Sequence, residues 1–298
     1  MKVFLIHHDD LDGYAAGAVA LLKYPGAETL SLGYDDASLY PKPDFLKGFD
    51  EVIIVDYTLP AETMLWLKQN SHLVWIDHHY SSIMQSKEMG YDDVDGLRCA
   101  PGELICGAEL AWKYFVGGDI PWFLKLVGDY DTFRNSKTPE FNDVVMPFFY
   151  STQIHADRIK PSEFHKEGFL LKTAGDFRNE AWTESLIAQG RAIQAYNKVY
   201  YKEMTSKNAF TRNIWGLRVV CFNCPGHGSS NIQPAFNPEE HDAMLRYAFN
   251  GTCWNYGLYA DTEKRPDVDC SKIARQYGGG GHRAAAGFTT DKLLAELQ

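Results

Sequence analysis

The sequence of 298 residues has few cysteines, no long apolar run and fewer basic than acidic residues. Six cysteines are too few for a disulfide framework in a chain of this length and are typical of a reducing, cytoplasmic compartment. The single Cys-x-x-Cys pair, Cys221 and Cys224, has no second pair to complete a zinc site. No run approaches the roughly 20 apolar residues that span a bilayer, and residues 3–6 are too short an apolar region for a signal peptide. We therefore expect a cytoplasmic protein that does not engage a membrane.

The charge balance argues against a broad nucleic-acid surface. The chain has 29 basic and 39 acidic residues, which give a formal net charge of -10, whereas proteins that bind long duplexes present extended basic faces. A short polyanion bound through metal ions and a few local cations is still compatible with this charge. The chain length and a hydrophobic content of 45% favour two packed domains over disorder.

Three predicted strands in the first half end in carboxylate or imidazole side chains. Apolar residues at 3–6, 51–55 and 73–76 favour buried strands, and the polar, glycine-containing residues 80–102 predict a loop. Because the ends of parallel strands meet at one edge of a sheet, the side chains that follow these strands are expected to lie together. Carboxylates and imidazoles bind divalent cations, so the sequence predicts a metal site. The candidate residues at these strand ends are His8, Asp10, Asp12, Asp56, Asp77, His78 and His79.

Some of these residues have alternative interpretations. Asp12 alone would also fit a helix N-cap. Asp129 and Asp131 follow a predicted helix and would fit a solvated helix end, but acids at a helix C-terminus oppose its dipole and favour a nearby cation. The prediction names His8 and Asp129 as ligands, with His7 and Asp131 as their respective rivals.

The second half predicts a helical region followed by a small α/β domain. Residues 133–206 favour helix, including one long connecting helix at 178–207. Tyrosines on that helix could stack bases, although aromatic residues at helical spacing are more often part of a core. The elements predicted beyond residue 214 are strands at 217–222 and 256–260 and helices at 239–249 and 271–276.

Four consecutive glycines, residues 278–281, precede His282 and Arg283. Glycine exposes backbone N–H groups and lets the chain approach a ligand closely, and the two side chains add donors for phosphate. A flexible linker is the alternative, but linkers seldom continue into His-Arg-Ala-Ala-Ala-Gly-Phe. The predicted phosphate-binding residues are Gly279, Gly280, Gly281, His282 and Arg283.

These motifs together resemble those of the DHH phosphoesterase superfamily. That superfamily includes RecJ-type exonucleases, nano-RNases, cyclic-dinucleotide phosphodiesterases and family II pyrophosphatases. The matching stretches are HxDxDG at residues 8–13, Asp56 after a strand, the Asp-His-His triplet at 77–79, Gly-Asp-Tyr-Asp-Thr at 128–132 and the GGGH motif before Arg283. One departure is that some branches have a histidine four residues before the first aspartate, where this chain has Ile6.

The resemblance covers nearly the whole chain and implies its architecture. It implies an α/β fold, with a catalytic parallel-sheet domain that carries helices on both faces over residues 1–190. A linker helix would extend to about residue 208, and a smaller α/β substrate-binding domain would cover residues 209–298.

The resemblance also implies a two-metal phosphodiesterase that uses Mn²⁺. Two ions about 4 Å apart activate water at neutral pH and neutralise phosphoryl oxygens during in-line attack. Asp77 would orient an imidazole and His79 would contact the phosphate or the leaving oxygen, so both are assigned catalytic roles. The implied ligands are His8, Asp10 and Asp56 for one ion, and Asp12, Asp56, His78 and Asp129 for the other.

The expected substrate is a short single-stranded RNA or DNA oligonucleotide, as for an oligoribonuclease, or another small nucleotide. A cyclic mono- or dinucleotide phosphodiesterase and a single-strand exonuclease are alternatives among enzymes, because they need the same metals and phosphate loop. The alternative outside the enzymes is a catalytically inactive nucleotide- or nucleic-acid-binding protein, against which the intact ligand set argues. The sequence does not decide between a monomer and a homodimer.

Overall fold

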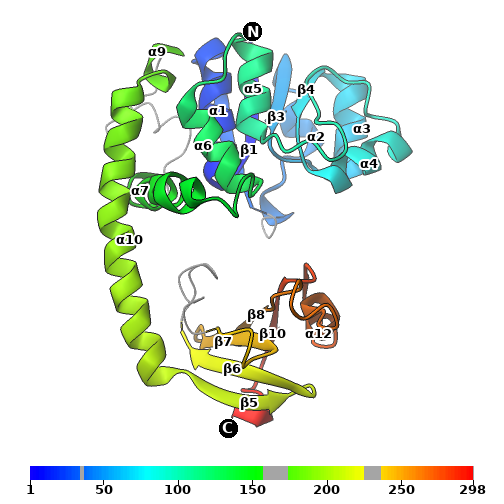
Figure 1. Ribbon diagram of the computed structural model, residues 1–298. Coiled ribbons are helices and arrows are strands. Elements are labelled where there is room, and N and C mark those ends of the chain that lie inside the picture. The colour runs from blue at the N-terminus through cyan, green and yellow to red at the C-terminus, as the bar shows by residue number, and fades with distance from the viewer. Residues whose placement is uncertain (34–36, 157–173, 225–235, 298) are drawn as a thin grey trace. The chain divides into compact units, whose positions relative to one another are not determined.

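The computed structural model describes residues 1–33, 37–156, 174–224 and 236–297 (Figure 1). The chain divides into two compact units, unit 1 over Met1–Gln194 and unit 2 over Ala195–Gln298. The long helix α10 (Glu180–Asn208) contributes to both units. Among the helices of the described residues, none combines the length and the hydrophobicity that crossing a bilayer requires.

Unit 1 is built on a parallel sheet of four strands in the order β2-β1-β3-β4. The central strands β1 and β3 are fully buried, which explains their continuous apolar sequences. Side chains alternate between two cores, so that Leu5 packs on one face of the sheet and Ile6 on the other. The strands are β1 (Val3–His8), β2 (Glu28–Leu32), β3 (Glu51–Val55) and β4 (His72–Ile76).

Helices cover both faces of this sheet (Figure 1). The face that carries Leu5 is covered by α1 (Leu11–Lys23), α5 (Gly107–Phe115), α6 (Trp122–Asp131) and α7 (Met146–Ala156). The opposite face is covered by α3 (Ala61–Asn70) and α4 (Tyr80–Met89), with the short α2 (Pro43–Leu46) beside them. A short segment η2 (Phe141–Val145) leads into α7.

Unit 2 contains a mixed sheet of six strands in the order β5-β6-β7-β8-β10-β9. Only the β6–β7 pair is parallel among the pairs of this sheet that the structure describes. The elements are β5 (Phe210–Ile214), β6 (Leu217–Asn223), β7 (Ala243–Phe249), β8 (Trp254–Tyr259), α12 (Cys270–Arg275), β9 (Gly280–Gly281) and β10 (Ala285–Thr290).

The predicted fold class is confirmed, whereas two local predictions were wrong and one strand was not predicted. A helix was predicted at 239–249, but residues 243–249 form strand β7, because that segment lies between β6 and β8 and buries Ala243, Leu245 and Tyr247 at a period of two. Residues 80–102 contain helix α4 in place of an uninterrupted loop. The edge strand β2 was not predicted, because its sequence alternates weakly and is only partly buried. The helical prediction for 133–206 includes residues 157–173, which lie outside the described residues.

Candidate metal centre

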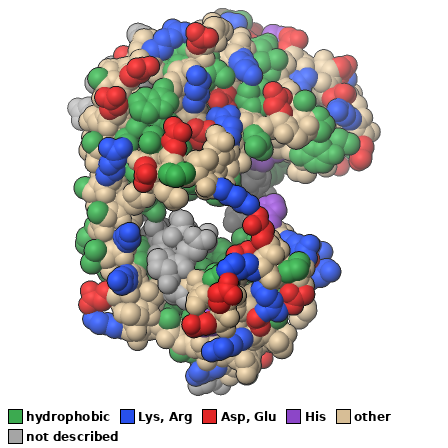
Figure 2. Space-filling model, in the orientation of Figure 1, with side chains coloured by type: hydrophobic (Ala, Val, Ile, Leu, Met, Phe, Trp, Pro, Cys, Tyr) green, Lys and Arg blue, Asp and Glu red, His purple; other side chains and the backbone are tan. Residues whose placement is uncertain are grey.

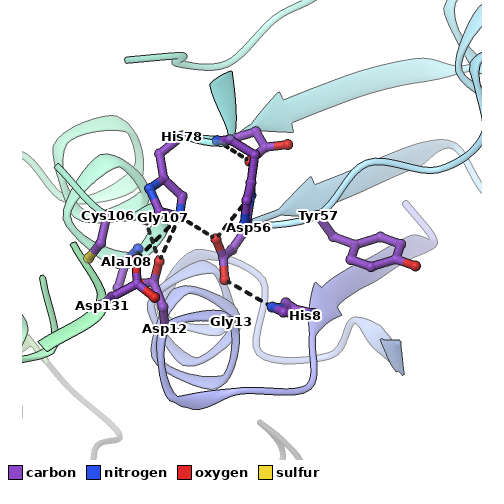
Figure 3. A network of polar contacts seen from close by, with 12 residues as sticks. His8, Asp12, Gly13, Asp56, Tyr57, His78, Cys106, Gly107, Ala108 and Asp131 are labelled. Atoms are coloured by element: carbon purple, nitrogen blue, oxygen red, sulfur yellow. Dashed lines mark hydrogen bonds and ion pairs between the residues drawn. The ribbon is translucent and has the colours of Figure 1, made fainter. Parts of the chain in front are cut away.

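The predicted strand-end residues converge at the carboxyl ends of β1, β3 and β4 (Figure 3). Asp10 is the N-cap of α1, and its Oδ1 accepts a hydrogen bond from the Gly13 N–H at 2.9 Å. A Cβ on Gly13 would lie 2.3 Å from the carbonyl oxygen of His8, so this tight turn requires glycine. The other Asp10 oxygen lies 2.9 Å from His8 Nδ1. The strand-to-helix turn therefore brings His8 and Asp10 together.

Asp56, directly after β3, occupies the middle of the cluster. Its φ of 55° lies in the left-handed region, which is uncommon for a residue with a side chain. Its N–H donates to the carbonyl of Ile76 on the neighbouring strand at 2.8 Å, which holds this conformation. Gly107 allows the approach of α5, because a Cβ there would lie 2.6 Å from the Asp56 Cβ.

The Asp56 carboxylate is completely buried, and neither oxygen receives a hydrogen bond from the described residues. Figure 3 shows this carboxylate between two imidazoles. His78 Nε2 lies 3.2 Å from Asp56 Oδ1, and His8 Nδ1 lies 3.8 Å from Oδ2. Burial of a carboxylate without a donor is costly, and coordination of a cation would offset that cost. This unsatisfied carboxylate is the feature that best fits a metal site.

Asp12 is held at the N-terminus of α5. Its two oxygens accept hydrogen bonds from the N–H groups of Gly107 and Ala108 at 2.6 and 2.8 Å. These N–H groups have no partner within the helix, and the positive end of the helix dipole favours a carboxylate there. His78 Nε2 lies 3.7 Å from Asp12 Oδ2. The sequence gave no indication that the N-terminus of α5 would bind Asp12, because Gly107 follows Asp12 by 95 positions.

The candidate ligand atoms form three groups, and within each group the atoms lie within 4.8 Å of one another. Asp56 belongs to two of these groups and His78 to two, so the groups form one continuous cluster. Mixed carboxylate and imidazole donors in two adjoining sets are suitable for a pair of divalent cations. The groups are His8, Asp10 and Asp56; Asp56, His78 and His79; and Asp12, His78 and Asp131.

The structure does not bring Asp129 to the cluster, and this part of the prediction needs correction. Asp129 Oδ1 accepts a hydrogen bond from Arg134 Nε at 2.6 Å, whereas Asp131 Oδ2 lies 3.4 Å from His78 Nε2. The sequence predicted that both acids follow a helix, but α6 continues to Asp131 and includes both of them. Residues two positions apart in a helix point about 200° apart, so only one of the two acids can face the cluster.

His8 reaches the cluster, and its rival His7 does not. The His7 side chain is completely buried on the other side of β1, with Nδ1 2.6 Å from the His8 carbonyl oxygen and its ring 5.3 Å from that of Tyr14. Burial lowers the pKa of His7 to about 4. Neighbouring residues in a strand point to opposite faces, which separates the two histidines.

Asp77 and His79 form a hydrogen-bonded pair at the edge of the cluster. Asp77 Oδ1 lies 2.7 Å from His79 Nδ1, and Thr58 Oγ1 donates to Asp77 Oδ2 at 2.5 Å. Burial lowers the pKa of His79, but the hydrogen bond and charge of Asp77 outweigh burial and raise it above its ordinary value. Thr58 was not among the predicted residues. It follows Asp56 by two positions, and that spacing was the only available signal.

Burial, together with repulsion from neighbouring carboxylates, raises the pKa of two acids in the cluster. Burial and the charges of Asp12 and Asp10 raise the pKa of Asp131 to about 8. Burial and the same two neighbours raise the pKa of Asp56 well above its ordinary value. The cluster therefore carries more negative charge than its surroundings stabilise, which favours protons or metal cations there.

The predicted phosphate loop lies in unit 2, where Gly280 and Gly281 form β9 and the residues after them turn into β10. A Cβ on Gly279 would lie 2.2 Å from the carbonyl oxygen of Gly287, so strand packing itself requires glycine there. Gly280 and His282 are exposed, and the Arg283 guanidinium donates to the carbonyl of Pro266. Gly281 has a φ of 135°. The small residues after Arg283 form a strand, although the sequence was compatible with a turn or helix.

Comparisons with known proteins agree with this fold. No family model matches the chain. A curated relative, the uncharacterized protein R106 of Acanthamoeba polyphaga mimivirus, is 24% identical over 257 residues, which cover 80% of this chain. The chain spans about half the length of that relative, 52%.

Two solved structures have a similar fold over nearly the whole chain. The pGpG-specific phosphodiesterase PggH from Vibrio cholerae has a TM-score of 0.51 and 16% identity, covering 97% of this chain and 93% of its own. An exopolyphosphatase-related protein from Bacteroides fragilis has a TM-score of 0.51 and 10% identity, covering 99% of this chain and 88% of its own.

Proposed function

The chain has the fold of the DHH phosphoesterases, and on this premise we propose that it is a metal-dependent phosphodiesterase that hydrolyses short oligonucleotides. The observation that carries the proposal is the buried Asp56 carboxylate, which has no hydrogen-bond donor among the described residues. A protein that only binds nucleotides has no need to bury such a group among further carboxylates. A divalent cation would both satisfy Asp56 and attract a phosphate.

Two cations, proposed to be Mn²⁺ because carboxylates and imidazoles both contribute, would supply an activated water and neutralise the phosphoryl oxygens. Asp56 would contribute one oxygen to each ion. The hydrogen bonds from the α5 N-terminus would fix Asp12, while the N-cap of α1 would fix Asp10. The proposed ligands are His8, Asp10 and Asp56 for one ion, and Asp12, Asp56, His78 and Asp131 for the other.

The pair formed by Asp77 and His79 is proposed to act on the substrate. With Nδ1 bound to Asp77, the His79 ring presents Nε2 as the nitrogen that would meet a phosphoryl or leaving oxygen. The hydrogen bond and charge of Asp77 raise the pKa of His79, which favours the protonated imidazole that could donate a proton to the departing oxygen. Thr58 would hold Asp77 in the orientation that this requires.

We further propose that the loop from Gly279 to Arg283 binds a substrate phosphate. The exposed His282 ring is a suitable donor, whereas the Arg283 guanidinium would have to leave Pro266 at least in part. The cytoplasmic location, the domain limits and the homodimer stay predictions.

Short substrates are favoured over long ones by the charge of the chain. Its formal net charge is -10, and on the face shown in Figure 2 acidic and basic side chains are interspersed. Long nucleic acid gains affinity through many Lys and Arg contacts, each of which releases about one counterion. The pGpG substrate named for PggH is itself a dinucleotide, which supports a short substrate for this chain.

A substrate panel tests the proposal. Dinucleotides, 5-mers, long single strands, cyclic nucleotides and pyrophosphate would each be incubated with Mn²⁺ or Mg²⁺, with Asp56→Asn as the control. We expect kcat/KM to be highest for substrates of about two to five nucleotides and to vanish in the control. Preference for cyclic nucleotides would favour that alternative, and absence of hydrolysis of every substrate would refute the proposed function.

A further inference from the structure

A pocket of about 560 Å³ adjoins the metal cluster within unit 1. It lies between α1, α6 and α7 and shares Asp10, Asp12 and Asp131 with the candidate ligand groups. Pockets that enclose small molecules typically measure about 300–1,000 Å³. The pocket is therefore large enough for one nucleoside. A nucleoside attached to a phosphate at the cluster would lie at the entrance of this pocket.

Three aromatic side chains line the pocket. Tyr130 from α6 and Phe149 from α7 stack with ring centroids 3.7 Å apart and planes within 11°. Both rings are half-buried, as is Tyr14 from α1, so part of each ring surface stays accessible in the pocket. Val127 and Leu11 complete an apolar surface. Such a surface is suitable for the flat face of an aromatic ligand.

The pocket offers no basic side chain from the described residues to an anionic occupant. Its charged lining residues are Asp9, Asp10, Asp12 and Asp131, and no Lys or Arg is among the described residues that line it. A second phosphate placed here would have no basic side chain among these residues to pair with, whereas the uncharged base of a nucleotide needs none. The Asp9 carboxylate, which belongs to none of the candidate ligand groups, can accept hydrogen bonds from the amino groups of a base, and the exposed Gln153 amide can both donate and accept.

We propose that this pocket is a nucleobase subsite, which binds the base of a nucleotide next to the scissile phosphate against Tyr14, Tyr130 and Phe149. The inference rests on the proposed function, since it takes the cluster as the place of the phosphate. It makes the enzyme selective for nucleoside phosphodiesters over polyphosphates and over phosphodiesters without a base.

The test combines altered substrates with a variant of the aromatic wall. The dinucleotide pApA is compared with two analogues in which one adenosine is replaced by an abasic deoxyribose. Phe149→Leu removes the stacking ring but retains an apolar side chain of similar volume. The matched control is Phe133→Leu, because Phe133 is 65% exposed and does not line the pocket. Circular dichroism establishes that each variant is folded.

One base–aromatic stack contributes about 5- to 150-fold in affinity. We expect wild-type kcat/KM to fall by a factor in this range for one abasic analogue. On pApA, Phe149→Leu should lose kcat/KM by a similar factor. On the abasic analogue that the wild type cleaves poorly, Phe149→Leu should lose little more, and Phe133→Leu should behave as the wild type on every substrate. Equal cleavage of pApA and both analogues, or an equal loss by Phe149→Leu on all substrates, would overturn the subsite.

Failure of the proposed function is distinguished by binding. If the wild type cleaves no dinucleotide, that function fails, but AMP and ribose 5-phosphate can still be compared by calorimetry in the presence of Mn²⁺. Tighter binding of AMP that is lost in Phe149→Leu would support the subsite, and equal binding of both ligands would overturn it. If the Leu variant does not fold, the comparison of AMP with ribose 5-phosphate on the wild type decides.

Discussion

Replacement of Asp131 by Asn should stabilise the protein when metal is absent. Burial and the charges of Asp12 and Asp10 raise the pKa of Asp131 to about 8, so its ionisation in the folded state is unfavourable. The unfolded state has the ordinary value of 3.8 and releases the proton earlier. Stability is therefore lost as pH rises from about 4 to about 8, and Asn, which cannot ionise, avoids this loss.

The size of the effect follows from the same numbers. The interval from 3.8 to about 8 covers about four pH units, and each unit corresponds to about 1.4 kcal/mol, which gives an upper limit of about 5 kcal/mol at pH 8. The Asp131 side chain keeps 24% of its surface exposed, and solvent screens part of the repulsion. We expect the free energy of unfolding of Asp131→Asn to exceed that of the wild type by about 2 kcal/mol at pH 8.

Urea unfolding in the presence of a chelator, at pH 5 and pH 8, measures this difference. The advantage of Asp131→Asn should shrink below about 1 kcal/mol at pH 5 and should reverse when Mn²⁺ is added, because the wild type binds the ion more tightly. Asp129→Asn is the matched control. It loses the charge-assisted bond to Arg134, so it should be less stable by about 1–2 kcal/mol at both pH values, with unchanged metal affinity. The reasoning would be refuted if Asp131→Asn were no more stable than the wild type at pH 8, or if its gain in unfolding free energy were the same at both pH values.

Three further predictions concern the neighbouring residues and the substrate. His78→Ala should lose bound metal, whereas His79→Ala should keep metal and lose about 10²- to 10⁴-fold in kcat; equal metal loss in a calorimetric titration would contradict the assigned roles. Thr58→Val should reduce kcat about 10- to 100-fold by releasing Asp77, and should lower the pH at which His79 titrates in NMR spectra; an unchanged titration would exclude this role. The logarithm of kcat/KM for short substrates should fall with the logarithm of salt concentration with a slope of about one to three, and a much steeper slope would indicate an extended binding surface.

The fold was largely predictable because its strands are buried on both faces. Continuous apolar runs at β1, β3 and β4 left little ambiguity, and their polar ends marked one edge of the sheet. The strand β7 was not predictable, because Ala243, Met244 and Leu245 favour helix in isolation and only pairing with β6 and β8 makes them a strand. β2 gave no signal, because its exposed edge position tolerates polar residues.

The candidate site was predictable where its residues follow a strand and was not where a helix supplies them. Because His8 and Asp56 sit next to buried strands, their positions followed from the sequence. The choice between Asp129 and Asp131 depended on where α6 ends. The observed helix is only about one turn longer than the sequence predicted, and that turn contains both acids. The role of Gly107 in holding Asp12 depends on the packing of α5 on α1, a contact between distant parts of the chain.

The central claim is that Asp56 joins two bound cations, and anomalous diffraction from crystals soaked in Mn²⁺ tests it most directly. The account predicts two peaks about 4 Å apart on either side of the Asp56 carboxylate, one near His8 and Asp10 and the other near His78 and Asp131. Crystals of Asp56→Asn should show weaker peaks or none. Strong Mn²⁺ peaks elsewhere in the wild type, with none at Asp56, would contradict the account.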